Sequence, residues 1–185
     1  MKSLIYWDQE EMRQLFRVLE GPRDKALFPL AYHHGLRASE VSLLLRTDLD
    51  PRRGRLFVHR VKGSLSGVYP LDPADLRRLR AYLRTRGDES PYLFLSNRGT
   101  PPERRSYWDL MQKYGQRAGL PKEKLRFHAL RHSIAVHLLD AGADVAFVCD
   151  RLGHANIQNT QRYLRYTTAT RDSQTRRLFS SPHIV

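Results

Sequence analysis

Apolar residues return every three or four positions over most of the chain, and this spacing predicts helices rather than strands. The first stripe consists of Met12, Leu15, Phe16 and Leu19. Asp8 and Glu11 precede it in the arrangement of a capping box, which marks the start of a helix. The helices predicted after it are 22–34, 38–45, one that opens at Asp72–Pro73, 104–118, 128–141, 144–152 and 157–166.

Two short runs with strand character flank a turn, and together they predict a β-hairpin. The runs are 55–59 and 68–71, with Lys62 at the tip between them, and a third short strand is predicted at 92–95. Many helices and one small antiparallel sheet indicate an α+β fold that is mainly α. No linker or repeat divides the chain, so we expect a single domain over residues 1–185.

The charge balance changes this picture from a generic helical domain to one that binds a polyanion. Lysine and arginine number 32 against 19 acidic residues, for a formal net charge of +13, and 26 of the 32 are arginine. Arginine holds phosphate with a rigid fork of donors, so nucleic acid is the first candidate partner and an anionic membrane the second. Hydrophobic residues make up 41% of the chain, enough for a packed core, which excludes a disordered polycation.

The chain also carries no sign of export or membrane insertion. No apolar run approaches the roughly 18 residues of a bilayer-spanning helix, and the first residues lead into no signal-peptide core. One cysteine, Cys149, excludes an internal disulfide framework and fits a reducing compartment. We therefore expect a cytoplasmic protein without a membrane partner.

Six side chains at separate places along the chain carry the chemistry that breaking a phosphodiester needs. They are Arg37, Lys62, His128, Arg131, His154 and Tyr163. Two arginines can hold the non-bridging oxygens, and a tyrosine hydroxyl can attack phosphorus once a base removes its proton. Histidine and lysine can shuttle protons to and from the oxygens. Glu40 lies beside Arg37 in sequence and could orient it.

Histidines with helical spacing can also bind zinc, and His128 and His132 lie four residues apart. A zincin motif needs glutamate where this chain has Ala129, and Cys149 is the only thiol, so a metal site is disfavoured. His132 is expected instead to pack against its neighbours or support them.

The order and context of these residues resemble the catalytic domain of the tyrosine recombinases, the phage integrase family. The matching motifs are Gly-Leu-Arg-Ala-Ser-Glu at 35–40, a hairpin lysine, His-Ala-Leu-Arg-His at 128–132, Leu-Gly-His at 152–154, and a tyrosine nine residues later. The resemblance covers about residues 6–168. Asn159 stands where threonine is common and Arg165 where histidine often follows the tyrosine, but neither is one of the six matched positions.

The resemblance implies a tyrosine-recombinase catalytic-domain fold and a DNA strand transferase that needs neither a metal nor ATP. Tyr163 would attack a scissile phosphate to give a 3′-phosphotyrosine and a free 5′-hydroxyl. Arg37 and Arg131 would clamp the non-bridging oxygens. His128 would help to deprotonate the tyrosine, and His154 would donate a hydrogen bond to the phosphate.

Two of the assignments leave alternatives. Lys62 would protonate the leaving 5′-oxygen, and Lys122 and Lys124 are weaker candidates because they precede the histidine box rather than occupy a hairpin. Tyr166 lies three residues after Tyr163 on the same predicted helix, so both hydroxyls could face one cleft. Only Tyr163 has the spacing from the Leu-Gly-His box that the family shows.

Other function classes also stay open. A catalytically silent DNA-binding relative would be free to lose one of the six residues, yet all six are present. An RNA-binding sheet would display more strand aromatics than this chain offers. A type IB topoisomerase shares the chemistry but typically has lysine at the position of His128.

Family members usually carry an N-terminal helical domain that closes around DNA, and this chain has no room for one. It resembles either an isolated catalytic domain or the short recombinases that invert fimbrial promoter segments. The resemblance further implies a homotetramer on double-stranded DNA, formed from a monomer in free solution, with the protein located at the nucleoid. Residues 170–185 would be a tail exchanged between protomers. Its apolar residues are Leu178, Phe179, Ile184 and Val185.

Overall fold

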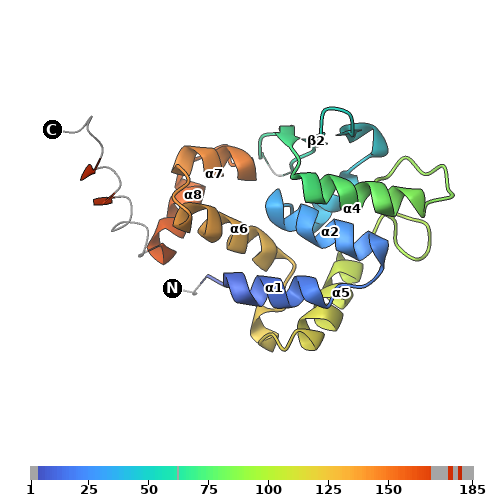
Figure 1. Cartoon of the computed structure of the whole chain (residues 1–185), viewed down its shortest axis with the longest axis horizontal. Helices are drawn as coiled ribbons and strands as arrows, with labels where there is room; N and C mark the ends of the chain where they lie inside the picture. Colours follow the sequence, from blue (N-terminus) through green and yellow to red (C-terminus); the bar gives the residue numbers. More distant parts are fainter. Residues whose placement is uncertain (1–3, 62, 168–174, 177–178, 181–185) are drawn as a thin grey trace.

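The computed structural model describes residues 4–61, 63–167, 175–176 and 179–180, and shows a mainly helical chain with one short sheet at its edge (Figure 1). The α-helices are α1 (Gln9–Arg17), α2 (Gly21–His33), α3 (Ala38–Leu43), α4 (Pro73–Arg84), α5 (Arg104–Arg117), α6 (His128–Asp140), α7 (Val145–Leu152) and α8 (Gln158–Gln161). The 3₁₀ segments are η1 (Arg46–Asp48), η2 (Lys122–Lys124) and η3 (Arg162–Tyr166). The strands are β1 (Leu49–Asp50), β2 (Arg55–Val58) and β3 (Gly67–Pro70). This is the mainly helical α+β arrangement that the sequence predicted.

The sheet consists of the predicted hairpin with a short strand on its edge. Strand β2 pairs antiparallel with β3, where Leu56 faces Tyr69, and on its other side with β1, where Leu56 faces Leu49. Leu56 and Val58 are buried while Arg55 is exposed and Phe57 half-buried, so β2 shows the period-two alternation of a strand with one buried face.

The third strand is not where the sequence predicted it. Residues 92–95 form only an isolated bridge, between Tyr92 and Leu45, and β1 takes the edge of the sheet instead. The Leu93 N–H donates to the carbonyl of Leu44 at 2.7 Å, so the segment is docked against the chain that follows α3. The apolar run signalled burial correctly, but a strand also needs a neighbour to pair with, and pairing is decided by the tertiary fold.

The predicted helices are confirmed to within two residues at their ends, with one exception. Helix α1 carries the predicted capping box, in which the carboxylates of Asp8 and Glu11 each accept from the other residue's backbone N–H. Helix α2 continues through Pro29 and ends before Gly35. The exception is the helix predicted at 157–166, which is the short α8 followed by the 3₁₀ segment η3.

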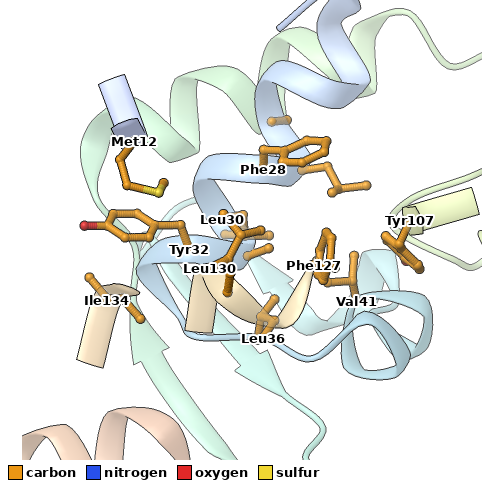
Figure 2. Close-up of a cluster of buried hydrophobic side chains, with 14 of the residues drawn as sticks. Met12, Phe28, Leu30, Tyr32, Leu36, Val41, Tyr107, Phe127, Leu130 and Ile134 are labelled. Carbon is orange, nitrogen blue, oxygen red and sulfur yellow. The ribbon is translucent and has the colours of Figure 1, made fainter. Parts of the chain in front are cut away.

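Helices α2 and α6 pack against each other through the centre of the core. Figure 2 shows Leu30 of α2 beside Leu130 of α6, with Phe28 and Phe127 completing the cluster. Nearly every residue from Ala129 to Val136 is buried, as expected for a helix surrounded by others. The histidine box at 128–132 is therefore carried by a rigid element. None of the helices in the described part of the chain is long and apolar enough to cross a membrane.

Candidate active site

Segments far apart in the sequence meet around a pocket of about 310 Å³. Its lining residues are Arg37, Gly63, Ser64, His128, Arg131, His132, His154, Ala155, Asn156, Asn159, Arg162 and Tyr163. Five of the six residues predicted from the sequence thus share one pocket. The sixth, Lys62, lies outside the described residues, and its role stays a prediction.

Arg37 stands immediately before α3, and Glu40 in the first turn of that helix fixes its direction. The Arg37 backbone N–H donates to Glu40 at 2.9 Å, and its guanidinium donates to the same carboxylate and to the hydroxyl of Ser64. The sequence predicted this orienting role for Glu40. The Arg37 side chain keeps 23% of its surface exposed, so it retains donors for a ligand in the pocket.

Glu40 is fully buried and shares its two oxygens among several cationic or N–H donors. Burial opposes its charged form, but the Arg37 backbone N–H and the guanidinium groups of Arg60, Arg37 and Arg131 outweigh burial and lower the pKa of Glu40. A buried carboxylate that stays ionised gives the surrounding guanidinium groups a fixed anchor.

Arg131 is held by backbone carbonyls from two other parts of the chain. Its side chain is 1% exposed, and it donates to the carbonyl of Gly35 at 2.6 Å and to that of Leu152 at 2.9 Å. Burial, and then the charges of Arg37 and Arg60, lower the pKa of Arg131 to about 10, so it remains a cation at neutral pH. Two positive groups, Arg37 and Arg131, therefore face one pocket.

The three histidines of the pocket are neutral at pH 7. Burial disfavours the charged form of each ring and lowers its pKa, and nearby positive groups, chiefly arginines, lower it further. The resulting pKa is about 4 for His128, about 3 for His132 and about 4 for His154. The Thr160 hydroxyl lies 2.7 Å from Nδ1 of His154, which leaves the other ring nitrogen for a ligand.

Tyr163 contacts a histidine that the sequence analysis did not assign to the site. Its hydroxyl oxygen lies 3.0 Å from Nδ1 of His132, and the His132 ring packs edge-on against that of His128. His132 was expected to pack against its neighbours or support them, and its ring does pack against that of His128, but the contact with Tyr163 was not predicted. Because His132 is neutral, its Nδ1 can accept a hydrogen bond from the Tyr163 hydroxyl in the tautomer that carries its proton on Nε2.

Tyr166, the alternative nucleophile, faces a different part of the molecule. Its hydroxyl accepts a hydrogen bond from the Leu4 backbone N–H at 3.0 Å, and its ring packs edge-on against Tyr6. Tyr163 lines the pocket and Tyr166 does not. Side chains three residues apart share a face in an α-helix and eclipse in a 3₁₀ helix, so winding alone would keep these two together. The contacts of Tyr166 with Leu4 and Tyr6 hold its ring away from the pocket instead.

A second residue that the sequence analysis missed is Arg60, whose side chain is completely buried against Glu40. A signal was present in the sequence. Leu56 and Val58 point inward along β2, and Arg60 continues this period of two, so an arginine occupies the next inward position. An arginine at an inward position needs a buried acid or carbonyl partner.

The pocket suits an anion that accepts several hydrogen bonds. Guanidinium groups line it together with neutral histidines and a tyrosine hydroxyl. Among the described residues, no three histidine, cysteine, aspartate or glutamate side chains gather in a way that could hold a metal ion. The arrangement can bind a phosphodiester, stabilise the charge of a five-coordinate phosphorus and supply an oxygen nucleophile with a base beside it.

Comparison with known proteins agrees with this geometry. The sequence pattern of the Phage integrase family matches residues 6–170. The chain is similar to the tyrosine recombinase XerA of Pyrococcus horikoshii, with 36% identity over 163 residues, which cover 86% of this chain and 56% of that protein. It is also similar to the type 1 fimbriae regulatory protein FimB of Escherichia coli, with 34% identity, covering 88% of this chain and 84% of FimB.

The fold is likewise similar to a solved structure. The crystal structure of XerA recombinase superposes with a TM-score of 0.82 at 26% identity, over 96% of this chain and 66% of that one. The chain thus spans little more than half the length of XerA from P. horikoshii but most of the length of FimB.

Proposed function

Because its sequence matches the Phage integrase family over residues 6–170, the chain belongs to that family of tyrosine recombinases, and we propose that it is a site-specific DNA recombinase. The observation that carries this proposal is one pocket that holds the hydroxyl of Tyr163 beside the guanidinium groups of Arg37 and Arg131. The net charge of +13 supports double-stranded DNA as the partner, since phosphate contacts dominate such binding.

In the proposed reaction the hydroxyl oxygen of Tyr163 attacks the scissile phosphorus. The tyrosine O–P bond forms as the P–O5′ bond breaks, which leaves a 3′-phosphotyrosine and a 5′-oxygen that takes a proton from Lys62. A 5′-hydroxyl of another strand then reverses these steps and releases the tyrosine. The phosphodiester energy stays in the protein linkage, so the scheme consumes no ATP and uses no metal.

The charge and position of each site residue determine its role in the proposed reaction. Arg37 and Arg131 hold the non-bridging oxygens and stabilise the charge that grows on them. We assign the tyrosine proton to His132, whose nitrogen lies at hydrogen-bond distance from the hydroxyl, in place of the role that the resemblance implies for His128. His128 and His154 then serve as neutral hydrogen-bond donors to the phosphate.

The test is a covalent trap on DNA. We expect Tyr163→Phe to abolish the covalent protein–DNA adduct while DNA affinity stays within about twofold, because the hydroxyl adds little contact area. The substrate is a pool of duplexes with randomised sequence around a nick, from which the short 5′-hydroxyl fragment escapes after cleavage. Denaturing gel electrophoresis counts the adducts, and sequencing the captured DNA gives the cleavage site.

Tyr166→Phe is the matched control, since it removes the same atom three residues away, and it should form the adduct at the wild-type rate. Adduct formation by Tyr163→Phe but not by Tyr166→Phe would overturn the assignment of the nucleophile. No adduct from the wild-type chain at low salt would refute the proposed activity.

We further propose that four protomers assemble on DNA from a protein that is monomeric in free solution. Exchange between two duplexes breaks four strands, and each break needs one Tyr163. A head-to-tail exchange of residues 170–185 between neighbours would close such a ring. Most of this tail lies outside the described residues. With DNA as the proposed substrate, we expect the activity in the cytoplasm, at the nucleoid when the protein is bound to DNA.

A further inference from the structure

The buried side chain of Arg60 joins three parts of the active site. Its surface is 0% exposed, and its donors reach the Glu40 carboxylate at 3.0 Å and the backbone carbonyls of His34 at 2.8 Å, Gly35 at 3.3 Å and Arg151 at 2.6 Å. The ring of Tyr69 from β3 lies 5.7 Å from the guanidinium carbon.

Each hydrogen-bond partner of Arg60 lies within three residues of a residue that lines the pocket. His34 and Gly35 precede Arg37 in the turn from α2 to α3, and Glu40 orients Arg37. Arg151 lies near the end of α7, three residues before His154. Arg60 itself continues β2 toward the tip of the hairpin, where Ser64 lines the pocket.

The hairpin and the end of α7 also touch directly at this junction. The Leu65 N–H donates to the carbonyl of Gly153 at 2.8 Å. A Cβ on Gly153 would lie 2.7 Å from the Leu65 carbonyl oxygen and 2.9 Å from Cγ of Arg60, both too close. Gly153 therefore does more than end α7, because its missing side chain lets the hairpin and Arg60 approach.

We propose that Arg60 is a positioning residue for the phosphate clamp, which consists of Arg37 and Arg131. This inference rests on the proposed recombinase function. Arg60 and the backbone N–H of Arg37 donate to one oxygen of Glu40, and the guanidinium of Arg37 and the Val61 N–H donate to the other. Arg131 comes no closer than 3.9 Å to the carboxylate and is held by carbonyls instead. With Arg60 in place, Glu40 has no need of further donors, so Arg131 and the remaining donors of Arg37 stay available for the phosphate.

An arginine is required for this task because its donors diverge from a rigid plane. Bonds to the Glu40 carboxylate and to carbonyls from two separate segments need a fork, and a lysine ammonium at the same place is a single point on a flexible stem. Without Arg60, the buried carboxylate of Glu40 would lose a charged donor and would draw in Arg131, whose guanidinium lies 3.9 Å away. The clamp would then be displaced from the phosphate.

The experiment compares Arg60→Met and Arg60→Lys with Arg86→Met. Arg86 is a matched control because it is also buried, at 7% exposed, and also bonds a carboxylate and backbone carbonyls, but it does not line the pocket. We expect Arg60→Met to slow single-turnover cleavage about 100-fold at saturating protein, the scale of a misplaced catalytic group. DNA affinity should change less than threefold, and Arg60→Lys should fall between Met and wild type.

A neutral substrate shows whether the effect acts through the clamp. The substrate has the DNA sequence that the wild-type chain cleaves, with a methylphosphonate in place of the scissile phosphate. This replacement removes one non-bridging oxygen and its negative charge. If Arg60 acts by placing Arg37 and Arg131, the loss caused by Arg60→Met should shrink on this substrate to about a tenth or less of its size on phosphate. An equal loss on both substrates, or cleavage by Arg60→Met at the rate of Arg86→Met, would overturn the proposal.

A measurement without DNA separates this inference from the proposed function. The Leu65 amide, bonded to Gly153, should exchange its hydrogen at least tenfold faster in Arg60→Lys and in any folded Arg60→Met than in Arg86→Met. Unchanged protection of that amide would refute the positioning role even if the wild-type chain cleaves no DNA. Failure of the wild-type chain to form an adduct, with this protection lost in the variants, would refute only the proposed recombinase activity.

Discussion

At the hydroxyl of Tyr163, burial and charge act in opposite directions. Burial raises its pKa, while the positive charges of Arg162, Arg131 and Arg37 lower it, and burial prevails. The free protein therefore holds Tyr163 protonated at neutral pH. Attack on phosphorus requires a base at the moment of reaction, and neutral His132 lies at the right distance to be that base.

This contact leads to a prediction for His132→Gln. Glutamine keeps a hydrogen-bonding side chain next to Tyr163 but cannot take its proton, so cleavage at pH 7 should slow about 100-fold, at the lower end of what a general base contributes. DNA affinity should stay within about twofold. The measurement is the single-turnover rate of adduct formation on the captured cleavage sequence.

The pH dependence of the cleavage rate tests the protonation state of His132. With a pKa of about 3, His132 stays neutral as the pH falls from 7 to 5, so the wild-type rate should be flat over this range. A base with the usual histidine pKa of about 6.5 would lose its neutral form, and with it the cleavage rate, by about 25-fold over the same range. His59→Gln, at a half-exposed histidine outside the pocket, is the control and should match wild type. If His132→Gln cleaves DNA at the wild-type rate, a group other than His132 accepts the tyrosine proton.

Much of the site could be predicted from the sequence, because its residues sit in short motifs whose chemistry is local. The orienting contact between Arg37 and Glu40 spans three residues and follows from the turn that begins α3. His132 and Arg60 were not predicted, because their roles depend on partners far away in the chain. The spacing of neither residue from Tyr163 or Glu40 carries that information.

At the scale of elements, the turn between α2 and α3 determines how the clamp is built. Gly35 has φ of +55°, and a Cβ there would lie 2.4 Å from Cδ2 of Leu152 at the end of α7. Its carbonyl accepts from both Arg60 and Arg131. Three elements meet at this residue because it has no side chain and can adopt a left-handed conformation.

Gly35→Ala should therefore destabilise the fold by about 3 kcal/mol, the sum of left-handed strain and overpacking against Leu152. Gly119→Ala is the matched control, since φ there is +69° but no atom lies within 4 Å of the added Cβ. It should cost only the backbone strain, about 1 kcal/mol. Urea unfolding midpoints at pH 7 measure both. Equal losses would show that Leu152 moves aside freely.

The elements themselves were predictable where a local signal decided them. The capping box of α1 and the helix periodicity act over a few residues, and both held in the structure. The segment 92–95 and the strand β1 were misjudged, because a two-residue strand has almost no pattern and pairing depends on which chain lies alongside. The split between α8 and η3 was missed for a similar reason. Packing of Tyr163 and Tyr166 in opposite surroundings overrides the preference for one continuous helix.

At the scale of the whole molecule, the described part of the pocket is assembled within one chain. Residues from Arg37 to Tyr163 line it, and the hydroxyl of Tyr163 meets His132 of its own protomer. One protomer can therefore bring nucleophile, base and clamp to a single phosphate. In the proposed reaction, cleavage of one strand needs one copy of the chain, whereas exchange of strands between two duplexes needs several copies held in register.

This difference gives a prediction for deletion of the residues after Thr170. The deletion leaves every residue of the pocket in place, so adduct formation on a single nicked site should stay within about twofold of the full chain. Exchange between a labelled and an unlabelled duplex should fall about 100-fold, because the proposed tail exchange raises the effective concentration of neighbouring protomers. Native gels of the protein–DNA complexes should show the loss of the largest species at the same time. If the shortened chain exchanges strands as fast as the full chain, the tail does not link the protomers, and the ring must be held by contacts between the folded domains or by the DNA itself.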